Sequence, residues 1–285
     1  MPFDHFFSKN YTVNYKGSLQ SINQPLVMGI LNIGEDSFFD GGKHNSINLA
    51  LKQTEKMLNE GADIIDIGAT SSKPSSKLIN ASIELKSIIP YINQIVKEFK
   101  NINLSIDTYN SKVAFEAVQH GTNIINDISA GEFDKEMFST IAKLKVPYIM
   151  MHTKGTPENM QFNPSYNNVT TDVMYYFSKK INELHQLGAT DLIIDPGFGF
   201  GKTLEHNYEL LNNLEFFTRL NKPLLVGISR KSMIYKLLNT SPDDALTGTI
   251  TLNTIALIKG ANILRVHDVK EATQVIELIK TINCK

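Results

Sequence analysis

Short, mostly apolar runs alternate with longer amphipathic segments along most of this chain, and no other feature restricts its possible folds as strongly. The short runs have the length and character of buried strands. A chain that repeats strand and helix in this way is typical of a parallel α/β fold. Eight strands are predicted, at Leu26 to Leu31, Ile64 to Ile67, Leu104 to Ile106, Ile124 to Ile125, Tyr148 to Met151, Leu192 to Ile194, Leu224 to Val226 and Ile263 to Val266.

Amphipathic helices are predicted after each of these strands. Several of them end at a glycine just before the next strand, where a helix C-cap belongs. Eight strand-helix units in 285 residues favour a closed (β/α)₈ barrel, the TIM barrel, over an open doubly wound sheet, since such barrels take about 250 residues. The predicted helices are Asn48 to Asn59, Ile79 to Phe99, Lys112 to Gln119, Asp134 to Leu144, Val169 to Leu187, Leu204 to Leu220, Ala245 to Ile258 and Val269 to Thr281.

No linker or low-complexity segment divides the chain, so we predict one domain over residues 1–285. Residues 1–25 precede the first barrel strand, and within them Tyr11 to Gln20 is predicted to form a hairpin that closes the bottom of the barrel.

Charge and cysteine content exclude several classes of partner and site. The 28 basic and 29 acidic residues nearly cancel, which argues against a nucleic-acid or acidic-membrane partner. The single cysteine, Cys284, excludes an intrachain disulfide and a cysteine-based metal cluster. We find no signal-peptide pattern and no run long enough to span a bilayer, so a cytoplasmic location is expected.

A glycine-rich stretch from Asp191 to Lys202 follows the sixth predicted strand. The strand ends in Asp195, and Pro196 and three alternating glycines come next. A P-loop would need glycine at position 196, and a dinucleotide-binding fingerprint would need glycine at position 202, so both motifs are excluded. Two interpretations remain: a carboxylate beside a backbone that a flat ligand can approach closely, or a tight turn whose aspartate only caps.

Polar residues follow nearly every predicted strand, at the end of the barrel where TIM-barrel active sites form. A purely structural protein has no reason to gather them there. Asp66 and Asp127 are interpreted as caps or turn formers. The others divide into an acceptor side with Asp107, Asn126 and Asp195, and an anion side with Lys231, Arg265, His267 and Asn32.

The two sides suggest a flat polar ring that carries a phosphate ester. A buried aspartate on the acceptor side suits the paired donors of a 2-aminopyrimidinone. Arg265 with His267 suits a phosphate or pyrophosphate. Met151 and Phe200 are candidates to contact the ring, although methionine is also a common core filler. Ser229 lacks an obvious histidine-carboxylate pair and is interpreted as a binding residue, not a nucleophile.

The metal suggested by these residues is Mg²⁺ held mainly by the phosphates of a substrate. The candidate ligands are oxygens, with no cysteine and no paired histidines, which argues against zinc. Asn32 is the candidate protein ligand.

The chain contains a series of short motifs. In order they are Met28-Gly-Ile-Leu-Asn32, Asp36-Ser-Phe38, Asp40-Gly-Gly42, Ser105-Ile-Asp107-Thr108, Ile125-Asn126-Asp127, Met151-His152, Asp195-Pro-Gly-Phe-Gly-Phe-Gly-Lys202, Val226-Gly-Ile-Ser-Arg-Lys-Ser232 and Arg265-Val-His-Asp-Val269. In their order and spacing the chain resembles the bacterial-type dihydropteroate synthases, from about Leu26 to Ile282. That family joins 6-hydroxymethyl-7,8-dihydropterin diphosphate to 4-aminobenzoate, which gives 7,8-dihydropteroate and pyrophosphate in folate synthesis.

The resemblance implies Mg²⁺ as cofactor, a homodimer, sensitivity of the family to sulfonamides, and an SN1-like displacement. It also assigns site residues by position. Asp107, Asp195, Lys231 and Arg265 would be catalytic. The pterin would be held by Asp107, Asn126, Met151, Asp195, Phe200, Gly227 and Lys231, the diphosphate by Asn32, Lys73, Arg265 and His267 with the metal on Asn32, and the aminobenzoate by Phe38, Ser72, Pro74, Ser229 and Arg230.

The chain departs from the family pattern in two loops expected to close over the second substrate. Gly34 and Glu35 stand where a threonine and a proline are usual, and Lys73 stands where an arginine is usual. Two other functions remain open from the sequence. A pterin-dependent methyltransferase would not need the anion side, and a pterin-binding barrel without catalysis would leave Asn32 and Arg265 unexplained.

Overall fold

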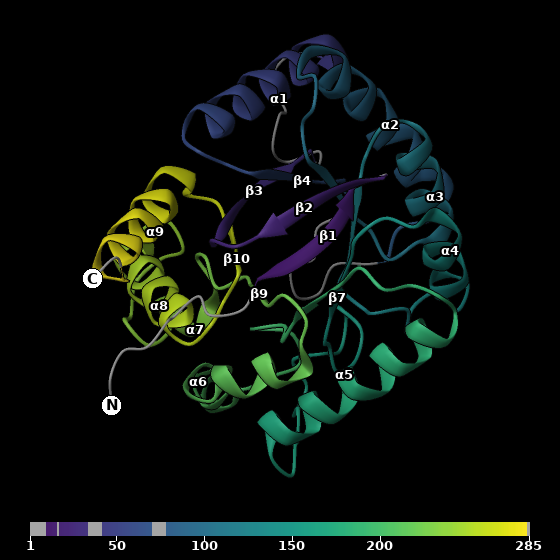
Figure 1. Cartoon of the computed structure of the whole chain (residues 1–285). Coiled ribbons are helices and arrows are strands. Elements are labelled where there is room, and N and C mark those ends of the chain that lie inside the picture. The colour runs from purple at the N-terminus through teal and green to yellow at the C-terminus, as the bar shows by residue number, and fades with distance from the viewer. Residues whose placement is uncertain (1–9, 16, 34–41, 70–77, 284–285) are drawn as a thin grey trace.

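The computed structural model describes residues 10–15, 17–33, 42–69 and 78–283, and it has the predicted barrel at its centre (Figure 1). Eight parallel strands pair in the order β8-β7-β6-β5-β4-β3-β10-β9. A bridge between Ile194 and Leu224 brings β8 against the chain entering β9 and closes the ring. The strands are β3 (Leu26–Asn32), β4 (Ile64–Gly68), β5 (Leu104–Asp107), β6 (Ile124–Asp127), β7 (Tyr148–Met151), β8 (Leu192–Asp195), β9 (Leu225–Val226) and β10 (Ile263–Val266).

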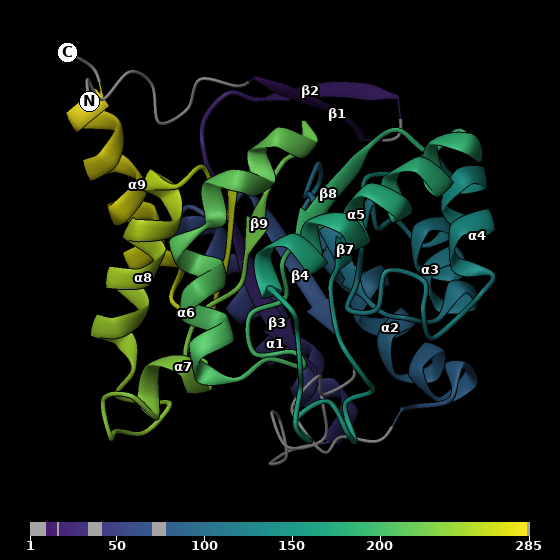
Figure 2. The ribbon, with the colours of Figure 1, turned by 90° about the horizontal axis from the view of Figure 1, so that it is seen from below.

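Helices surround the strands as an outer ring, which is the arrangement predicted from the alternation in sequence (Figures 1 and 2). Outward-facing strand residues such as Ile65, Ile125 and Ile194 are fully buried in the core between the two layers. The helices are α1 (Gly42–Asn59), α2 (Ala81–Glu98), α3 (Ser111–Gln119), α4 (Met137–Leu144), α5 (Val169–Gln186), α6 (Leu204–Asn212), α7 (Ser232–Tyr235), α8 (Leu246–Ile258) and α9 (Val269–Asn283).

The segment after β8 differs from the single helix predicted over Leu204 to Leu220. The α-helix ends at Asn212, and a 3₁₀ helix, η2 (Leu214–Leu220), follows it. Asn212 and Asn213 stand at the break, and asparagine side chains compete with the backbone for hydrogen bonds. The short helix α7 was not predicted. In the described ranges, no helix combines the length and apolar character needed to cross a membrane.

An antiparallel hairpin of β1 (Tyr11–Tyr15) and β2 (Ser18–Ile22) lies across one end of the barrel, as predicted (Figure 2). Its inward side chains pack on a layer of apolar residues inside the barrel, and we call these residues together the apolar floor. The backbone N–H of Asn14 also donates to Oδ1 of Asp191, 2.9 Å away. The apolar floor consists of Val13, Tyr15, Ile22, Met28, Ile64, Ile124, Ile149, Ile193, Leu225 and Ile263.

The interior changes character further along the same strands. Side chains alternate along a strand, so the residue two positions after each floor residue faces the interior again. On β4, β6, β8 and β10 these next residues are polar or charged. We call Asp66, Asp107, Asn126, Asp195 and Arg265 the polar layer. It forms at the carboxyl ends of the strands, opposite the hairpin.

Candidate active site

Arg265 extends from β10 across the polar layer to two aspartates on neighbouring strands. Its Nε donates to Oδ2 of Asp66 and its Nη2 donates to Oδ2 of Asp107, both at 2.7 Å. Asn126 Nδ2 also donates to Oδ2 of Asp66, at 3.0 Å. The prediction that Asp66 only caps a turn is therefore wrong, because its side chain points into the barrel and binds a cation.

These contacts also correct the division into an acceptor side and an anion side. Arg265 was placed with the cations, yet its side chain is long enough to bond to Asp107 on the acceptor side. The two groups thus form one charged network. Asp127, in contrast, has the turn-forming role predicted for it, since it accepts from the backbone N–H groups of Ser129 and Gly131, both at 2.8 Å.

Burial and neighbouring charges shift the protonation of this network. Burial raises the pKa of the Asp107 carboxyl to about 7, with Arg265 opposing the shift and Asp66 adding to it. Burial alone would lower the pKa of the Arg265 guanidinium, but the charges of Asp66 and Asp107 outweigh it and raise that pKa. Arg265 thus stays a cation, whereas Asp107 changes charge near neutral pH.

Asp195 and Lys231 form a second part of the site beside the glycine-rich loop. Oδ1 of Asp195 accepts from the N–H of Gly197 at 2.8 Å, so this buried carboxylate also caps its own loop. Lys231 Nζ donates to the carbonyl oxygen of Phe198 at 2.6 Å and lies 4.7 Å from the centre of the Phe200 ring. Burial lowers the pKa of Lys231 to about 8, against the opposing charge of Asp195.

Packing requires a glycine at position 197 of this loop. Gly197 has φ +72°, and a Cβ there would lie 2.0 Å from the carbonyl oxygen of His152. Buried Lys202 joins the same two loops, because its Nζ lies 2.9 Å from His152 Nδ1 and donates to the carbonyls of Gly197 at 2.9 Å and Phe200 at 3.0 Å. The sequence did not reveal this role, although a lysine directly after a glycine loop was a signal.

An apolar cluster borders the polar layer at the mouth of the barrel. It brings Met151 and Phe200 together, as expected for a surface that contacts a flat ring. Tyr109, Ile128 and Met160 complete the cluster. These three residues were not predicted, because they lie in loops where periodicity gives no signal.

Ser229 has a histidine neighbour that the sequence did not reveal. Its Oγ lies 3.0 Å from Nδ1 of His267 and accepts from the N–H of the same residue at 3.2 Å. Burial, with the charges of Arg265 and Arg230, lowers the pKa of His267 to about 4. The imidazole is therefore neutral at physiological pH.

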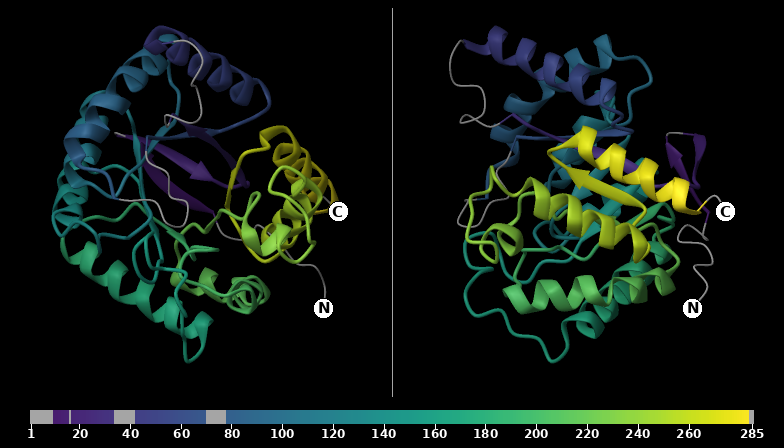
Figure 3. Two further views of the ribbon diagram at one scale, coloured as in Figure 1. Left: turned by 180° about the vertical axis from the view of Figure 1, so that it is seen from behind. Right: turned by 90° about the vertical axis from the view of Figure 1, so that its left-hand side faces the viewer.

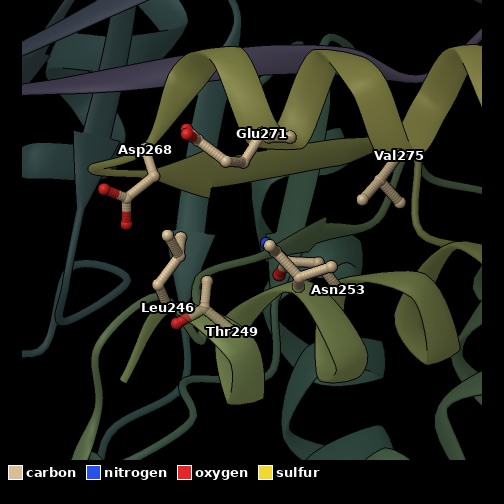
Figure 4. A pocket seen from close by; sticks show the side chains of 8 residues that line it. Leu246, Thr249, Asn253, Asp268, Glu271 and Val275 are labelled. Carbon is tan, nitrogen blue, oxygen red and sulfur yellow. The ribbon is translucent and has the colours of Figure 1, made fainter. Parts of the chain in front are cut away.

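Arg230 is engaged by a carboxylate of the neighbouring loop. Its Nε and Nη2 donate to the two oxygens of Asp268, at 3.0 and 2.6 Å. Behind Asp268, α8 and α9 run side by side and leave a narrow groove that Thr249 and Asn253 also line (Figures 3 and 4). Arg230 is thus tied to the loop after β10.

Comparison with known proteins identifies the family of the chain. The model of the family described as pterin binding enzyme matches residues 28–267. The dihydropteroate synthase of Escherichia coli K12 is 41% identical over 273 residues, which are 95% of this chain and 96% of that protein. The chain belongs to the dihydropteroate synthase family.

Solved structures of the family share the fold closely. The dihydropteroate synthase of Yersinia pestis in complex with a sulfonamide drug superposes with a TM-score of 0.90 at 37% identity, covering 96% of this chain and all of that one. The Xanthomonas albilineans dihydropteroate synthase with 4-aminobenzoic acid also has a TM-score of 0.90, at 32% identity, covering 97% of this chain and all of that one.

Of the remaining predicted residues, the structure describes Gly227 and Asn32 and leaves the others out. Gly227 follows β9, and a Cβ there would lie 3.8 Å from Cβ of Arg265 and 3.9 Å from Lys231 Nζ. Asn32 is exposed at the end of β3. The predictions for Phe38, Ser72, Lys73 and Pro74, and the departures at Gly34 and Glu35, lie outside the described residues.

Asn32 is the candidate protein ligand for Mg²⁺. Across the described ranges, no three His, Cys, Asp or Glu side chains are grouped closely enough to hold a metal. An exposed amide oxygen on Asn32 fits Mg²⁺, because this ion often keeps several waters and uses few protein ligands besides substrate phosphates.

Proposed function

We propose that this chain is a dihydropteroate synthase of folate biosynthesis. It joins 6-hydroxymethyl-7,8-dihydropterin diphosphate to 4-aminobenzoate and releases pyrophosphate. One observation carries the proposal: a buried layer of hydrogen-bond acceptors contacts an arginine and lies beside a lysine at the mouth of a barrel of this family. Such a layer can hold a ring that presents donors and, next to it, an anionic leaving group.

The pterin ring is assigned to the acceptors and to the apolar cluster. Asp107, Asn126 and Asp195 supply oxygens that suit an amino group and an adjacent ring N–H. Oδ1 of Asp195 is used by Gly197, so Oδ2 is the atom for the ring. Phe200 and Met151 give the ring an apolar surface, and Gly227 lies beside Arg265 and Lys231, where a Cβ would come within ordinary contact distance of both.

The diphosphate is assigned to Arg265, His267, Asn32 and Lys73. Asp66 and Asp107 use the Nε and Nη2 groups of Arg265 but not Nη1. The neutral His267 ring supports binding by hydrogen bonding, not by charge. Mg²⁺, when bound with Asn32 as its protein ligand, would neutralise charge on the leaving pyrophosphate.

The charges of the site support a displacement in which the carbon–oxygen bond breaks first. Asp107 and Asp195 favour the positive charge that develops on the pterin, and Arg265 stabilises the departing pyrophosphate. Lys231, with a pKa of about 8, is positioned by Phe198 beside the same ring. The neutral aryl amine of 4-aminobenzoate then captures the cation and needs no strong base.

The aminobenzoate site is proposed from Phe38, Ser72, Pro74, Ser229 and Arg230. The hydrogen bonds of Ser229 to His267 and of Arg230 to Asp268 support a role in shaping this side of the mouth. A homodimer in the cytoplasm remains part of the proposal.

Turnover separates this proposal from the two alternatives. The purified protein is mixed with the pterin diphosphate, 4-aminobenzoate and Mg²⁺, and pyrophosphate is followed with time. A synthase releases pyrophosphate only when both substrates are present. A methyltransferase or a non-catalytic pterin-binding protein releases none, and that outcome would overturn the proposal.

A further inference from the structure

The guanidinium of Arg265 is divided between two carboxylates that differ in how a ligand can reach them. One carboxylate would ordinarily take two donors of an arginine together. Here Asp66 takes Nε and Asp107 takes Nη2. The Asp66 side chain is 0% exposed and that of Asp107 is 9% exposed. A ligand at the mouth can therefore reach Asp107 but not Asp66.

Asp66 also orients a second residue of the site through the same atom. Its Oδ2 accepts from Asn126 Nδ2 at 3.0 Å as well as from Arg265. Its other oxygen, Oδ1, is buried and has no hydrogen-bond partner among the residues that the structure describes. One carboxylate oxygen thus connects β10, which carries the arginine, with β6, which carries the amide.

Building on the proposed function, we infer that Asp66 is a positioning residue for both halves of the pterin diphosphate. It holds Asn126 in place to bind the ring and Arg265 in place to bind the diphosphate. Asp107 gives up its hydrogen bond to Arg265 and accepts from the N–H donors of the pterin instead. When Asp107 turns to the ring, Asp66 is the anchor that keeps the guanidinium in place. Arg265 then has Nη1 and Nη2 to offer to the phosphate oxygens.

The test measures how much the diphosphate contributes to binding. The Kd for the pterin alcohol is divided by the Kd for the pterin diphosphate with Mg²⁺, both by calorimetry. In Asp66→Asn we expect this ratio to fall at least about tenfold, and the alcohol itself to bind about tenfold more weakly because Asn126 loses its charged acceptor. The control is Asp63→Asn at the other end of β4, where the carboxylate accepts only from the N–H of Val27 among the bonds of the described residues.

A double-variant comparison separates positioning from a general structural effect. In an Arg265→Ala background, Asp66→Asn should not lower the ratio further but should still weaken the alcohol. A ratio within twofold of wild type in Asp66→Asn, or a further fall of the ratio in the Arg265→Ala background, would overturn the inference.

The pKa of Asp107 gives a second readout. The direction in which it moves in Asp66→Asn shows whether Asp66 acts only through its charge or holds Arg265 in place. If Asp66 acts only as a nearby negative charge, its removal lowers the pKa of Asp107. If Asp66 holds Arg265, its removal loosens the arginine. The charge of Arg265 lowers the pKa of Asp107 by more than the charge of Asp66 raises it. Losing the arginine therefore raises the pKa of Asp107. We expect a rise in the infrared titration of the Asp107 carboxyl in Asp66→Asn. A fall would contradict the positioning role.

Asp66→Asn leaves Arg265 with one carboxylate, so a variant that removes both charges is included. Asp66→Asn with Arg265→Met replaces the ion pair by neutral groups, which folded proteins tolerate well. It should bind the alcohol about tenfold more weakly than Arg265→Met alone. Wild-type turnover is measured first, because an absence of pyrophosphate release contradicts the proposed function, whereas an active enzyme with an unchanged ratio contradicts only the role of Asp66.

Discussion

The apolar floor and the polar layer share β4, β6, β8 and β10, where their residues are two positions apart, and they contribute to different properties of the molecule. The floor buries apolar side chains against the hairpin, and each such side chain stabilises the fold by about 1.5 to 3 kcal/mol. The polar layer buries charges whose desolvation offsets most of what their pairing contributes. One barrel therefore separates stability at one end from binding at the other.

The largest expected effect is on stability and comes from the floor. Ile193→Ala removes a fully buried side chain, and we expect the free energy of unfolding to fall by about 2 to 5 kcal/mol, measured by denaturant titration. Steady-state kcat and KM of the folded protein should stay within about twofold of wild type. Ile83→Ala is the matched control, since that isoleucine is 60% exposed and should change stability by less than about 0.5 kcal/mol. A loss of turnover in folded Ile193→Ala would show that the floor also contributes to binding or catalysis, and the proposed separation of the two ends would be wrong.

The next effect is on binding and comes from the polar layer. Asp195→Asn gives the ring one acceptor and an unwanted donor, so pterin affinity should fall by about 2 to 4 kcal/mol by calorimetry. Its free energy of unfolding should be equal to or above that of wild type, because a buried charge is removed. Asp244→Asn, on the surface, is the control. Unchanged pterin affinity would show that Asp195 only caps its loop.

A third effect, which reaches its full size only at the upper end of the pH range, comes from Asp107. The pKa of Asp107 is about 7 in the folded protein and about 3.9 in an unfolded chain, so the folded state binds the proton more tightly. Its contribution to stability is complete below pH 4 and is lost as pH rises through 7. Asp107→Asn should therefore gain stability relative to wild type between pH 4 and pH 8, by up to about 4 kcal/mol. Parallel pH dependence in both proteins would contradict this.

The smallest effect comes from Gly34 and Glu35, the two positions where the loop departs from the family pattern. Changing them should leave both the apolar floor and the polar layer as they are. Gly34→Thr with Glu35→Pro should reduce the conformations that the open loop loses on closing, by about 0.4 to 1 kcal/mol per site. We expect a severalfold lower KM for 4-aminobenzoate and nearly the same affinity for the pterin diphosphate. Each single change is tested alongside. An unchanged or higher aminobenzoate KM would mean that this chain has its own compensated loop geometry.

The sequence predicted the barrel because the alternation of strand and helix is repeated in every unit, so a misplaced boundary such as that at Asn212 changes little. It predicted polar residues at the strand ends but misjudged Asp66. Counting in steps of two from Ile64 would have placed Asp66 inside, and the same count from Ile124 places Asp127 outside.

Other features of the site depend on contacts that no local pattern contains. Ser229 meets His267 only because β9 and β10 are neighbours, although their residues are 38 positions apart. Arg265 reaches Asp66 across 199 positions, and which cation pairs with which carboxylate follows from side-chain reach. A sequence shows that charges converge at one end of the barrel, but their pairing is decided in three dimensions.

The pairing of β3 with β10 has a consequence for the synthesis of this protein on the ribosome. Leu26 of β3 pairs with Ile263 of β10, so the first barrel strand waits for nearly the whole chain before its edge is covered. At about 5 to 20 residues per second, that edge stays open for roughly 12 to 47 s. An open parallel strand offers unpaired N–H and C=O groups to any passing chain. The nascent protein thus exposes this edge early in its synthesis and covers it last.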